Sequence, residues 1–458
     1  MRLIRLSVTL PLLAAVTLTA ACTPEAPRPP AAATPSATGT ATPSGPTQLP
    51  TPSKNVEEPR ALLDPDGRVL DVRWVPVASQ VEARQGETYT VLDTIRSERG
   101  CVERIGARAV LGGGATVVGI GPKETCTWDG GPRLPANDRI GVRDADGTLR
   151  RFVTTEGLVP EDDPRQITAV AASATHVVWA ETASTDLFHD DWRIFAARLD
   201  DGVPHLVAKA EDFTGGKEPL TFFEVQLAVG ADRVWWSTAP ADGEGPPVVV
   251  SRRLDGTGPI DVVAKASDSP VVTSDGLVVR TLTEVSTMSQ DDQGEPAAEI
   301  MWRGTGLALV ADNEATPLLS IDTTETLGTE EELGALSSDG VRVAFAVGDA
   351  VYALDLSREA IVGVHGGGVK PTTDISDEFR EATTIASTAL DEGRLVWSFG
   401  GGAGATTSPV YVLELASDAL QRIVVEDNAG EVVAAAGNIA WSGFVDDRRT
   451  TTVVDWRD

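Results

Sequence analysis

Residues 171–179, Ala-Ala-Ser-Ala-Thr-His-Val-Val-Trp, and residues 227–236, Leu-Ala-Val-Gly-Ala-Asp-Arg-Val-Trp-Trp, follow one pattern. In each, a stretch of small residues precedes a short turn, and an apolar run then ends in tryptophan. β-Branched and aromatic residues favour strands, and turn residues separate them, so the pattern predicts a pair of short antiparallel strands. The pattern recurs along the chain, so an internal repeat decides the fold.

Later copies of the apolar strand lie at Gly276–Val279, Val341–Phe345, Arg394–Trp397 and Asn438–Trp441. From the first tryptophan to the last, the repeat length is about 52 residues. A second hairpin is expected after several copies, at 193–209, 248–265, 350–364 and 410–425. Two hairpins make a four-stranded antiparallel sheet, and six or seven such repeats are typical of a β-propeller.

An earlier and less regular copy is expected between residues 107 and 154, with strands at Thr116–Ile120, Arg139–Arg143 and Leu149–Val153. Counting it gives six full blades, and the last copy then holds only three strands before the chain stops. The strand expected at Arg68–Val75 has no blade of its own. Propellers as a class often close their ring with an N-terminal strand, so Arg68–Val75 is predicted to complete a seventh blade.

The predicted fold is therefore an all-β propeller of seven four-stranded blades, closed by an N-terminal strand. Six or eight blades, or a pair of β-sandwiches, are the alternatives. Asp-Gly pairs are expected to form tight strand connections, because glycine tolerates positive φ; they begin at Asp146, Asp201, Asp255, Asp275 and Asp339. The equivalent tryptophans are expected to pack between blades and not to form a ligand cage; they are Trp179, Trp236, Trp397 and Trp441.

The first 22 residues carry the features of an export signal. Arg2 and Arg5 precede an apolar run, residues 6–18, that is too short to span a bilayer, and small residues then lead to Cys22. A cysteine directly after the cleavage site resembles the bacterial lipoprotein signal, in which that cysteine is lipidated. We predict a signal peptide at 1–21 and lipidation of Cys22. A secreted protein that keeps Cys22 as a free thiol is the alternative.

Residues 23–55 contain nine prolines in 33 positions, and no aromatic residue. Such a segment cannot bury enough apolar surface to offset its ordering entropy, so a disordered tether is expected. At about 3.1 Å per residue it would reach roughly 100 Å. Thr19 departs from the lipoprotein pattern, which prefers leucine at this position. The tether nevertheless favours lipidation of Cys22, because a spacer is useful between a lipid anchor and a folded domain. The predicted organisation is a signal peptide at 1–21, Cys22 and tether at 22–59, and a propeller domain at 60–458.

The tether and the acidic, lysine-poor domain resemble lipoproteins of high-GC Gram-positive bacteria. The repeats of residues 60–458 resemble TolB-type and WD40-like propellers in their pattern of repeats. The resemblance does not extend to a diagnostic motif, because no Trp-Asp dipeptide recurs at the blade ends. The resemblance implies a protein held on the extracytoplasmic face of the cell membrane through its lipid anchor.

Cys101 and Cys126 lie 25 residues apart in the first repeat. Exported proteins meet oxidising conditions, so a disulfide between them is predicted, and a metal-binding or catalytic thiol is the alternative. The net charge of −30 argues against nucleic acid and against direct adhesion to anionic lipid. Scattered acidic residues indicate solvated loops, with a site for basic partners or divalent cations as the alternative.

No catalytic, cofactor-binding or metal residue is predicted. The four histidines lack zinc-binding spacing; they are His176, His189, His205 and His365. Gly400–Ala405 has the letters of a dinucleotide-binding loop, but a strand is expected after it instead of a helix. His365–Gly368 is similar to the oxyanion loop of esterases, yet the chain lacks a G-x-S-x-G elbow. The Asp-Gly runs at Asp64 and Asp144 lack the glycine and glutamate of a calcium loop and indicate turns.

The predicted function is a binding or scaffolding module, without a cofactor and as a monomer, that holds an envelope protein or a glycan. One alternative is a hydrolase or lyase acting on cell-wall or extracellular sugars or esters. Another is an extracytoplasmic sensor subunit. Convergence of Asp, Glu or His side chains at one end of the central channel would favour the enzyme, whereas an apolar, small-residue lining would favour binding.

Overall fold

The computed structural model describes most of the chain from residue 59 onward. The described ranges are 59–96, 105–121, 139–152, 165–183, 189–216, 220–221, 225–290, 296–312, 314–323, 332–366, 385–399, 407–426, 430–445 and 448–457. Contacts divide the chain into two units, one of residues 53–285 and 301–458 and one of residues 1–52 and 286–300. The first unit carries the fold. In the described ranges, no helix has the length and apolarity that crossing a membrane requires.

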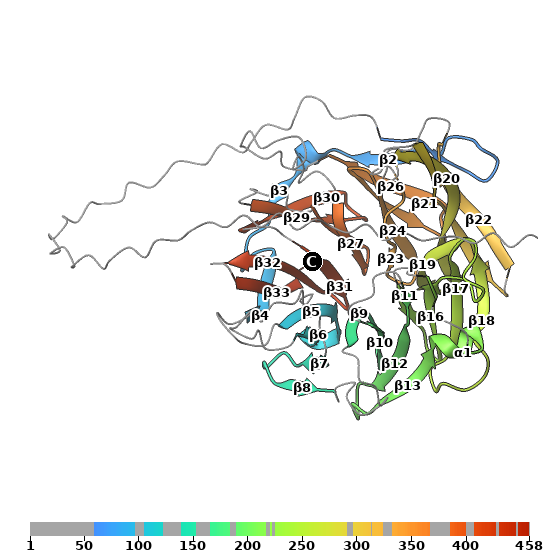
Figure 1. Ribbon diagram of the computed structural model, residues 1–458. Helices are drawn as coiled ribbons and strands as arrows, with labels where there is room; N and C mark the ends of the chain where they lie inside the picture. Colours follow the sequence, from blue (N-terminus) through green and yellow to red (C-terminus); the bar gives the residue numbers. More distant parts are fainter. Residues whose placement is uncertain are drawn as a thin grey trace, which may run out of the picture. The chain divides into compact units, whose positions relative to one another are not determined.

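Almost every regular element is a strand. Within the described ranges, the helical elements are α1 (Ala210–Thr214) and the 3-10 turns η1 (Val77–Ser79) and η2 (Gly112–Gly114). Most strands belong to seven sheets, or blades, that follow one another along the chain and surround a common centre, and β11 and β14 form a separate two-stranded sheet (Figure 1). In each of blades 1 to 6, four core strands run outward from the channel in chain order, and neighbours among these four are antiparallel.

The first three blades are regular four-stranded sheets. Blade 1 comprises β5 (Ile105–Val110), β6 (Thr116–Ile120), β7 (Arg139–Arg143) and β8 (Leu149–Arg151). Blade 2 comprises β9 (Arg165–Ala172), β10 (His176–Ala183), β12 (Arg193–Arg198) and β13 (Pro204–Lys209). Beside it, β11 (His189–Asp190) pairs with β14 (Leu220–Thr221). Blade 3 comprises β15 (Leu227–Val229), β16 (Arg233–Thr238), β17 (Val248–Arg253) and β18 (Asp261–Lys265).

The last four blades share the core pattern and also receive strands from the N-terminal segment. Blade 4 comprises β19 (Ser267–Thr273), β20 (Gly276–Gln290), β21 (Pro296–Ala311) and β22 (Glu314–Ile321). Blade 5 comprises β23 (Ser337–Ser338), β24 (Arg342–Val347), β25 (Ala350–Asp355) and β26 (Ala360–His365). Blade 6 comprises β27 (Ile385–Asp391), β28 (Arg394–Phe399), β29 (Thr407–Glu414) and β30 (Ala419–Glu426). Blade 7 comprises β31 (Val432–Ala435), β32 (Asn438–Val445), β33 (Arg448–Trp456) and β4 (Tyr89–Arg96).

The all-β, seven-bladed fold with closure by an N-terminal strand is confirmed, but the expected closing strand was wrong. Strand β4 completes blade 7 by antiparallel pairing with β33. The segment expected to do so contains β2 (Val72–Val75), which instead adds a parallel fifth strand to β26 of blade 5. The physical reason is packing: Val75 is buried in the core between blades 5 and 6, whereas Tyr89 packs against Trp441 and Trp456 of blade 7.

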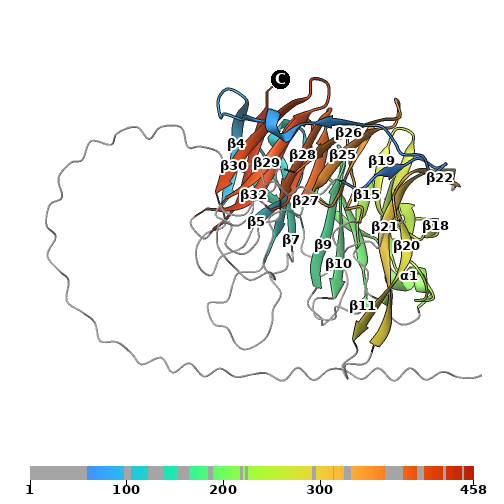
Figure 2. The same ribbon diagram turned by 90° about the horizontal axis from the view of Figure 1, so that it is seen from above.

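The N-terminal segment runs along the outer edges of four consecutive blades (Figures 1 and 2). Strand β1 (Leu62–Leu63) pairs with β22 of blade 4, and β2 follows on blade 5. Strand β3 (Val81–Glu82) then pairs in parallel with β30 of blade 6, and β4 ends the path in blade 7. This belt, residues 60–96, therefore joins the four blades that the chain forms from Ser267 onward.

Large aromatic side chains form the core at equivalent places in the repeat, as the sequence predicted. The repeat tryptophans are all buried; they are Trp179, Trp236, Trp397 and Trp441. In three blades the aromatic residue of the second strand stacks on an aromatic residue directly opposite in the third strand; the pairs are Trp179–Phe195, Phe345–Tyr352 and Trp397–Tyr411. Directly opposed pairs of this kind stabilise antiparallel sheets, so the repeat encodes its own core.

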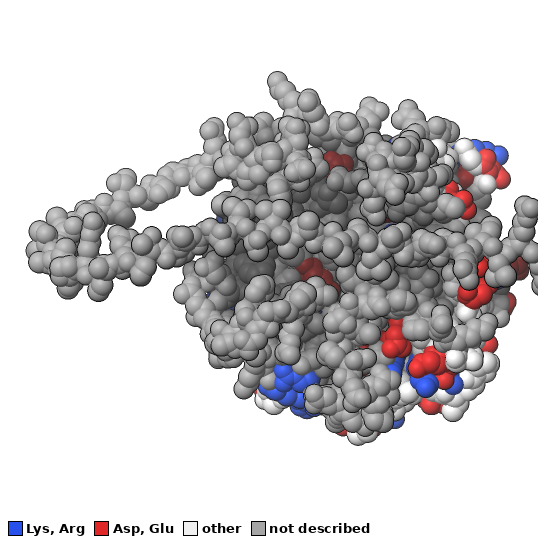
Figure 3. Space-filling view, in the orientation of Figure 1, with Lys and Arg blue, Asp and Glu red and all other residues white. Residues whose placement is uncertain are grey.

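The predicted Asp-Gly turns are also confirmed. The glycines that follow the five aspartates have φ between +64° and +143°; they are Gly147, Gly202, Gly256, Gly276 and Gly340. Asp64 and Asp144 likewise begin turns, in which each accepts the amide of the glycine three residues later on its backbone carbonyl. Acidic and basic side chains are interspersed along the lower and right-hand rim in Figure 3. One of the ion pairs joins Arg252 of β17 to Asp212 of α1 at 2.9 Å.

We predict that two truncations will separate the roles of β4 and the rest of the belt. A chain beginning at residue 84 keeps β4 but exposes the sites of Leu62 and Val75, each worth about 1.5–3 kcal/mol when buried. It should unfold cooperatively at a lower temperature than a chain beginning at residue 59. A chain beginning at residue 97 lacks the closing strand and should show no cooperative transition in thermal melts followed by circular dichroism. Equal behaviour of the two truncations would contradict closure by β4.

Candidate functional site

The first strands of the seven blades surround a central channel with a volume of about 510 Å³. These inner strands meet near one axis, so the chain places small residues on them: β9 contains Ala169, Ala171 and Ala172, and β31 contains Ala434 and Ala435. The volume lies in the range of ordinary ligand pockets. The channel is therefore the candidate functional site.

The channel lining is mostly apolar or hydroxylic. Aliphatic side chains come from every blade, and hydroxyl groups lie between them; these are Thr168, Ser269, Ser337, Ser338, Ser387 and Thr388. Among the described lining residues only Arg108 of β5 and Glu431 beside β31 are charged, and their side chains pair at 3.2 Å. This pair joins blade 1 to blade 7, where the ring closes. Each charge is largely compensated by the other, so the walls present little net charge to a ligand.

A strained segment of blade 4 aims polar groups at the channel. Ser269 has a left-handed backbone conformation, with φ of +47°, which costs a non-glycine residue about 1–2 kcal/mol. Its hydroxyl donates to the side-chain oxygen of Gln226, another lining residue. The adjacent Asp268 is buried and binds Arg280 through two contacts of 2.6 Å, which fixes the segment. The hydroxyl of Ser337, also in the lining, is buried and has no hydrogen-bond partner.

This arrangement suits binding of an uncharged or weakly polar group. Serine, threonine and glutamine side chains can donate and accept hydrogen bonds, and the aliphatic residues exclude water from the groups between them. Proton transfer in the channel would need an acid or base, and the described lining offers only the paired Glu431. Within the described ranges, no three His, Cys, Asp or Glu side chains gather as metal ligands would.

At one end of the channel the blades are fastened together through the tight turns between first and second strands. The Asp339 carboxylate of blade 5 accepts the amide of Gly393 in blade 6 at 3.2 Å. The equivalent Asp391 of blade 6 accepts the amide of Gly437 in blade 7 at 2.6 Å. Asp339 also pairs with Arg342 at 2.9 Å, whereas burial raises the pKa of Asp391 despite the opposing hydrogen bond.

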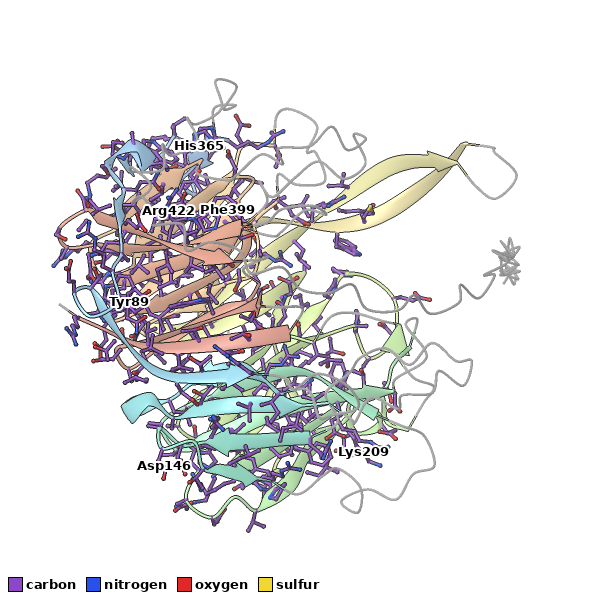
Figure 4. The ribbon with its side chains drawn as sticks, turned by 90° about the vertical axis from the view of Figure 1, so that its left-hand side faces the viewer. Tyr89, Asp146, Lys209, His365, Phe399 and Arg422 are labelled. Carbon is purple, nitrogen blue, oxygen red and sulfur yellow. The ribbon has the colours of Figure 1, made fainter. Side chains whose placement is uncertain are left out.

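The residues singled out in the sequence do not meet in one site. Cys22, Cys101 and Cys126 lie outside the described residues, so lipidation and the disulfide stay predictions. His205 bonds the Leu254 carbonyl at 2.7 Å, and His365 pairs with Asp349 at 2.8 Å on the outer side of blade 5. Figure 4 labels His365 at the end of β26, and the glycines that follow it from residue 367 onward lie outside the described ranges. Burial lowers the pKa of His176, the first residue of β10.

Sequence reasoning identified the inner strands but missed the polar groups on them. Small-residue runs such as 171–173 and 227–229 were expected to be first strands of repeats, and the channel is lined by Ala171 and Ala172 of the first run and Leu227 of the second. Nothing local marks Arg108 or Glu431, because the two residues are 323 positions apart and become neighbours only when the ring closes. Gln226 had one signal, its place directly before a small-residue strand.

Comparison of the sequence with protein-family models gives no match, and comparison with curated proteins gives no significant match. Comparison with solved structures finds β-propellers at low similarity. The β-propeller domain of the trilobed protease from Pyrococcus furiosus is 10% identical, with a TM-score of 0.45, over 76% of this chain and 95% of that one. The Pan2 WD40 domain from Neurospora crassa is 9% identical, with a TM-score of 0.43, over 82% and 98%.

The acylaminoacyl peptidase of Pyrococcus horikoshii is 10% identical, with a TM-score of 0.43, over 75% of this chain and 49% of that enzyme. At this level of similarity the comparisons say nothing about what the chain binds. The seven-bladed assignment rests on the strand pairing of the chain itself.

We predict a pH-dependent gain in stability from Asp391→Asn. The pKa of the folded-state carboxyl is raised by burial, so its stabilising contribution is present below the unfolded pKa of about 3.9 and is lost as pH rises through the folded pKa. Asparagine keeps an oxygen acceptor for Gly437 and removes the charge. The gain in free energy of unfolding relative to wild type should therefore be absent below about pH 4 and should grow as the pH rises above it, in denaturant titrations.

Asp339→Asn is the matched control from the preceding blade. That change removes one of two charged partners of Arg342, the other being Asp355, so it should lower the free energy of unfolding at neutral pH by about 0.5–2 kcal/mol. A stability difference at Asp391 that stays constant with pH would contradict the assignment.

Proposed function

We propose that the protein is a membrane-anchored extracytoplasmic lipoprotein whose propeller binds an envelope protein or a glycan. The observation that carries the binding role is the lining of the channel: small, apolar and hydroxyl side chains, with the one described charged pair satisfied internally. A sheet edge or loop of a partner protein, or the hydroxyls and apolar faces of a sugar, would fit such walls. The enzyme alternative has no described group of side chains that favours it.

The anchoring role is supported by the order of segments along the chain. A lipid on Cys22 would be followed by the proline-rich stretch, and the belt begins at residue 60, where the Arg60 guanidinium donates to the Asp322 carbonyl at 3.0 Å. The first belt strand then pairs on the outer edge of blade 4, away from the channel. The described chain therefore joins the ring at an outer edge and not at the channel.

For the anchor, we predict that Cys22→Ala abolishes incorporation of an alkyne-labelled fatty acid and moves the protein from the membrane fraction to the medium. Cys101→Ala is the matched control, because it removes a cysteine from the first repeat and leaves the signal intact. It should keep both label and membrane association. Membrane association of Cys22→Ala at wild-type levels would show that another feature holds the protein there.

For the channel, we predict position-specific photocrosslinking in intact cells. A photoreactive amino acid replaces Ser338 or Ala434 in the channel lining, or Val203, which is 64% exposed on the outside of blade 2. The channel positions should yield one shared crosslinked protein or glycan that is absent at Val203. Identical products at all three positions, or none at the channel positions, would contradict binding in the channel whether or not the anchor prediction holds.

A further inference from the structure

The outer strands of the blades differ in how they guard against pairing with other chains. An open, regular sheet edge is a template for an added strand, and bulges, prolines or short strands blunt it. Strand β8 has three residues, and the ladders that hold β13 and β18 are bulged at Ile194/Phe195 and Val249/Val250. The uncovered part of β22 contains Pro317 and lies next to a bulge. The pairing of β4 with β33 shifts register at Val453/Val454.

Blades 5 and 6 have regular outer ladders without a register shift. In blade 5 the belt covers this edge almost completely, because Val72–Val75 pairs with Ile361–Val364 of β26. In blade 6 the belt covers only the first part of β30, since Val81 and Glu82 pair with Gln421 and Arg422. No other described strand pairs with the remainder, residues 423–426.

The direction of the backbone groups on this open edge follows from one hydrogen bond. The Ala83 amide donates to the Arg422 carbonyl at 2.8 Å, so the polar backbone groups of Arg422 point outward from the sheet. Outward and inward pairs alternate along an antiparallel ladder. The amide and carbonyl of Val424 therefore also point outward, opposite Pro409 on the inner side.

Apolar side chains accompany these backbone groups. Val424 is 48% exposed, and Val81 of β3 is 65% exposed. Figure 4 views this side of the molecule, with Arg422 and Tyr89 labelled on the outer strands of blades 6 and 7. Exposed apolar residues beside unpaired backbone groups are the features that strand addition uses.

We propose that the open edge, Ile423–Glu426 of β30, binds an extended segment of a separate protein by strand addition. We expect the ligand to be a polypeptide, because another extended backbone matches the alternating amide and carbonyl groups of the edge, which are spaced at about 3.3 Å per residue. The segment carries an apolar, β-branched residue beside Val424. Basic flanking residues complement the net charge of −30 of this chain. The chain's own belt binds the same strand in this way at residues 81–83.

The test uses Val424→Pro, because the amide at this position lies outside the β29–β30 ladder. Proline removes the outward donor while the inward hydrogen bonds of Ile423 and Val425 remain, so the variant should keep its fold. The full-length protein is screened against a phage-displayed library of random heptapeptides. Binding peptides should share alternating β-branched residues and basic flanks, and lose at least tenfold in affinity for Val424→Pro.

Val424→Lys and Val262→Lys form the matched pair of controls. Both replace an exposed outer-strand valine, but Val262 belongs to the bulged ladder of blade 3. The selected peptides should lose affinity for Val424→Lys and keep it for Val262→Lys. Hydrogen exchange should slow at the Val424 amide when a selected peptide binds.

Three outcomes would overturn the proposal. The library could give no peptide whose binding depends on Val424. The Val424 amide could already be protected from exchange in the isolated protein, independently of concentration, because another part of the chain covers the edge. Protection that grows with protein concentration would identify a second copy of the chain as the occupant. None of these outcomes bears on the channel, which the photocrosslinking experiment tests separately.

Discussion

The pairing of β4 with β33 is the constraint on which the rest of the structure depends. A propeller blade buries its faces against its two neighbours, so a ring with an incomplete blade exposes core on both sides of the gap. Strand β4 fills that gap, and its Asp93 also binds Arg143 of blade 1 through both carboxylate oxygens. The Arg108–Glu431 pair spans the same seam on the channel side. Side-chain contacts therefore hold blade 7 to blade 1 on both the outer side and the channel side of their interface.

Closure by an N-terminal strand places the belt, and the belt connects the proposed anchor to the ring. A pull from a lipid-held tether would act first on the short β1–β22 contact and the Arg60–Asp322 hydrogen bond. It would next reach β2, which is fixed by four paired residues and by contacts of Arg73 with Asp418 and the Leu415 carbonyl. The closing strand comes last in this order. In an anchored propeller connected in this way, a pulling force would reach the contacts of β1 and β2 before it reached the closing strand β4.

The repeat was predictable from sequence because the residues that define each copy lie close together in the chain. A strand such as His176–Ala183 shows its turn, apolar run and tryptophan within a few residues, and the strands Arg233–Thr238 and Arg394–Phe399 repeat that order. The closing strand was not predictable in the same way. Arg68–Val75 and Tyr89–Arg96 have similar apolar content, and the choice between them depends on contacts with residues some 360 positions later. Arg108 and Glu431 of the channel pose the same difficulty, since ring closure alone makes them neighbours.

The contrast between blades 5 and 6 explains why the belt leaves one edge open. Tyr352 and Tyr411 occupy equivalent places, and each faces one residue of the outer strand: Gly363 in blade 5 and Arg422 in blade 6. Glycine makes room for Trp74 of the belt, whose ring would lie 2.8 Å from a Cβ at position 363.

In blade 6 the guanidinium of Arg422 takes that place and hydrogen-bonds the Tyr411 hydroxyl, which opposes the rise that burial causes in the tyrosine pKa. The Tyr352 hydroxyl, in contrast, is buried without a partner under the tryptophan. An arginine at this position excludes a second covering tryptophan, so the belt makes only a short contact with β30 and turns away after Ala83. Arg422 thus supplies the hydrogen bond to the buried Tyr411 hydroxyl of blade 6, and the same side chain leaves the outer edge of that blade exposed.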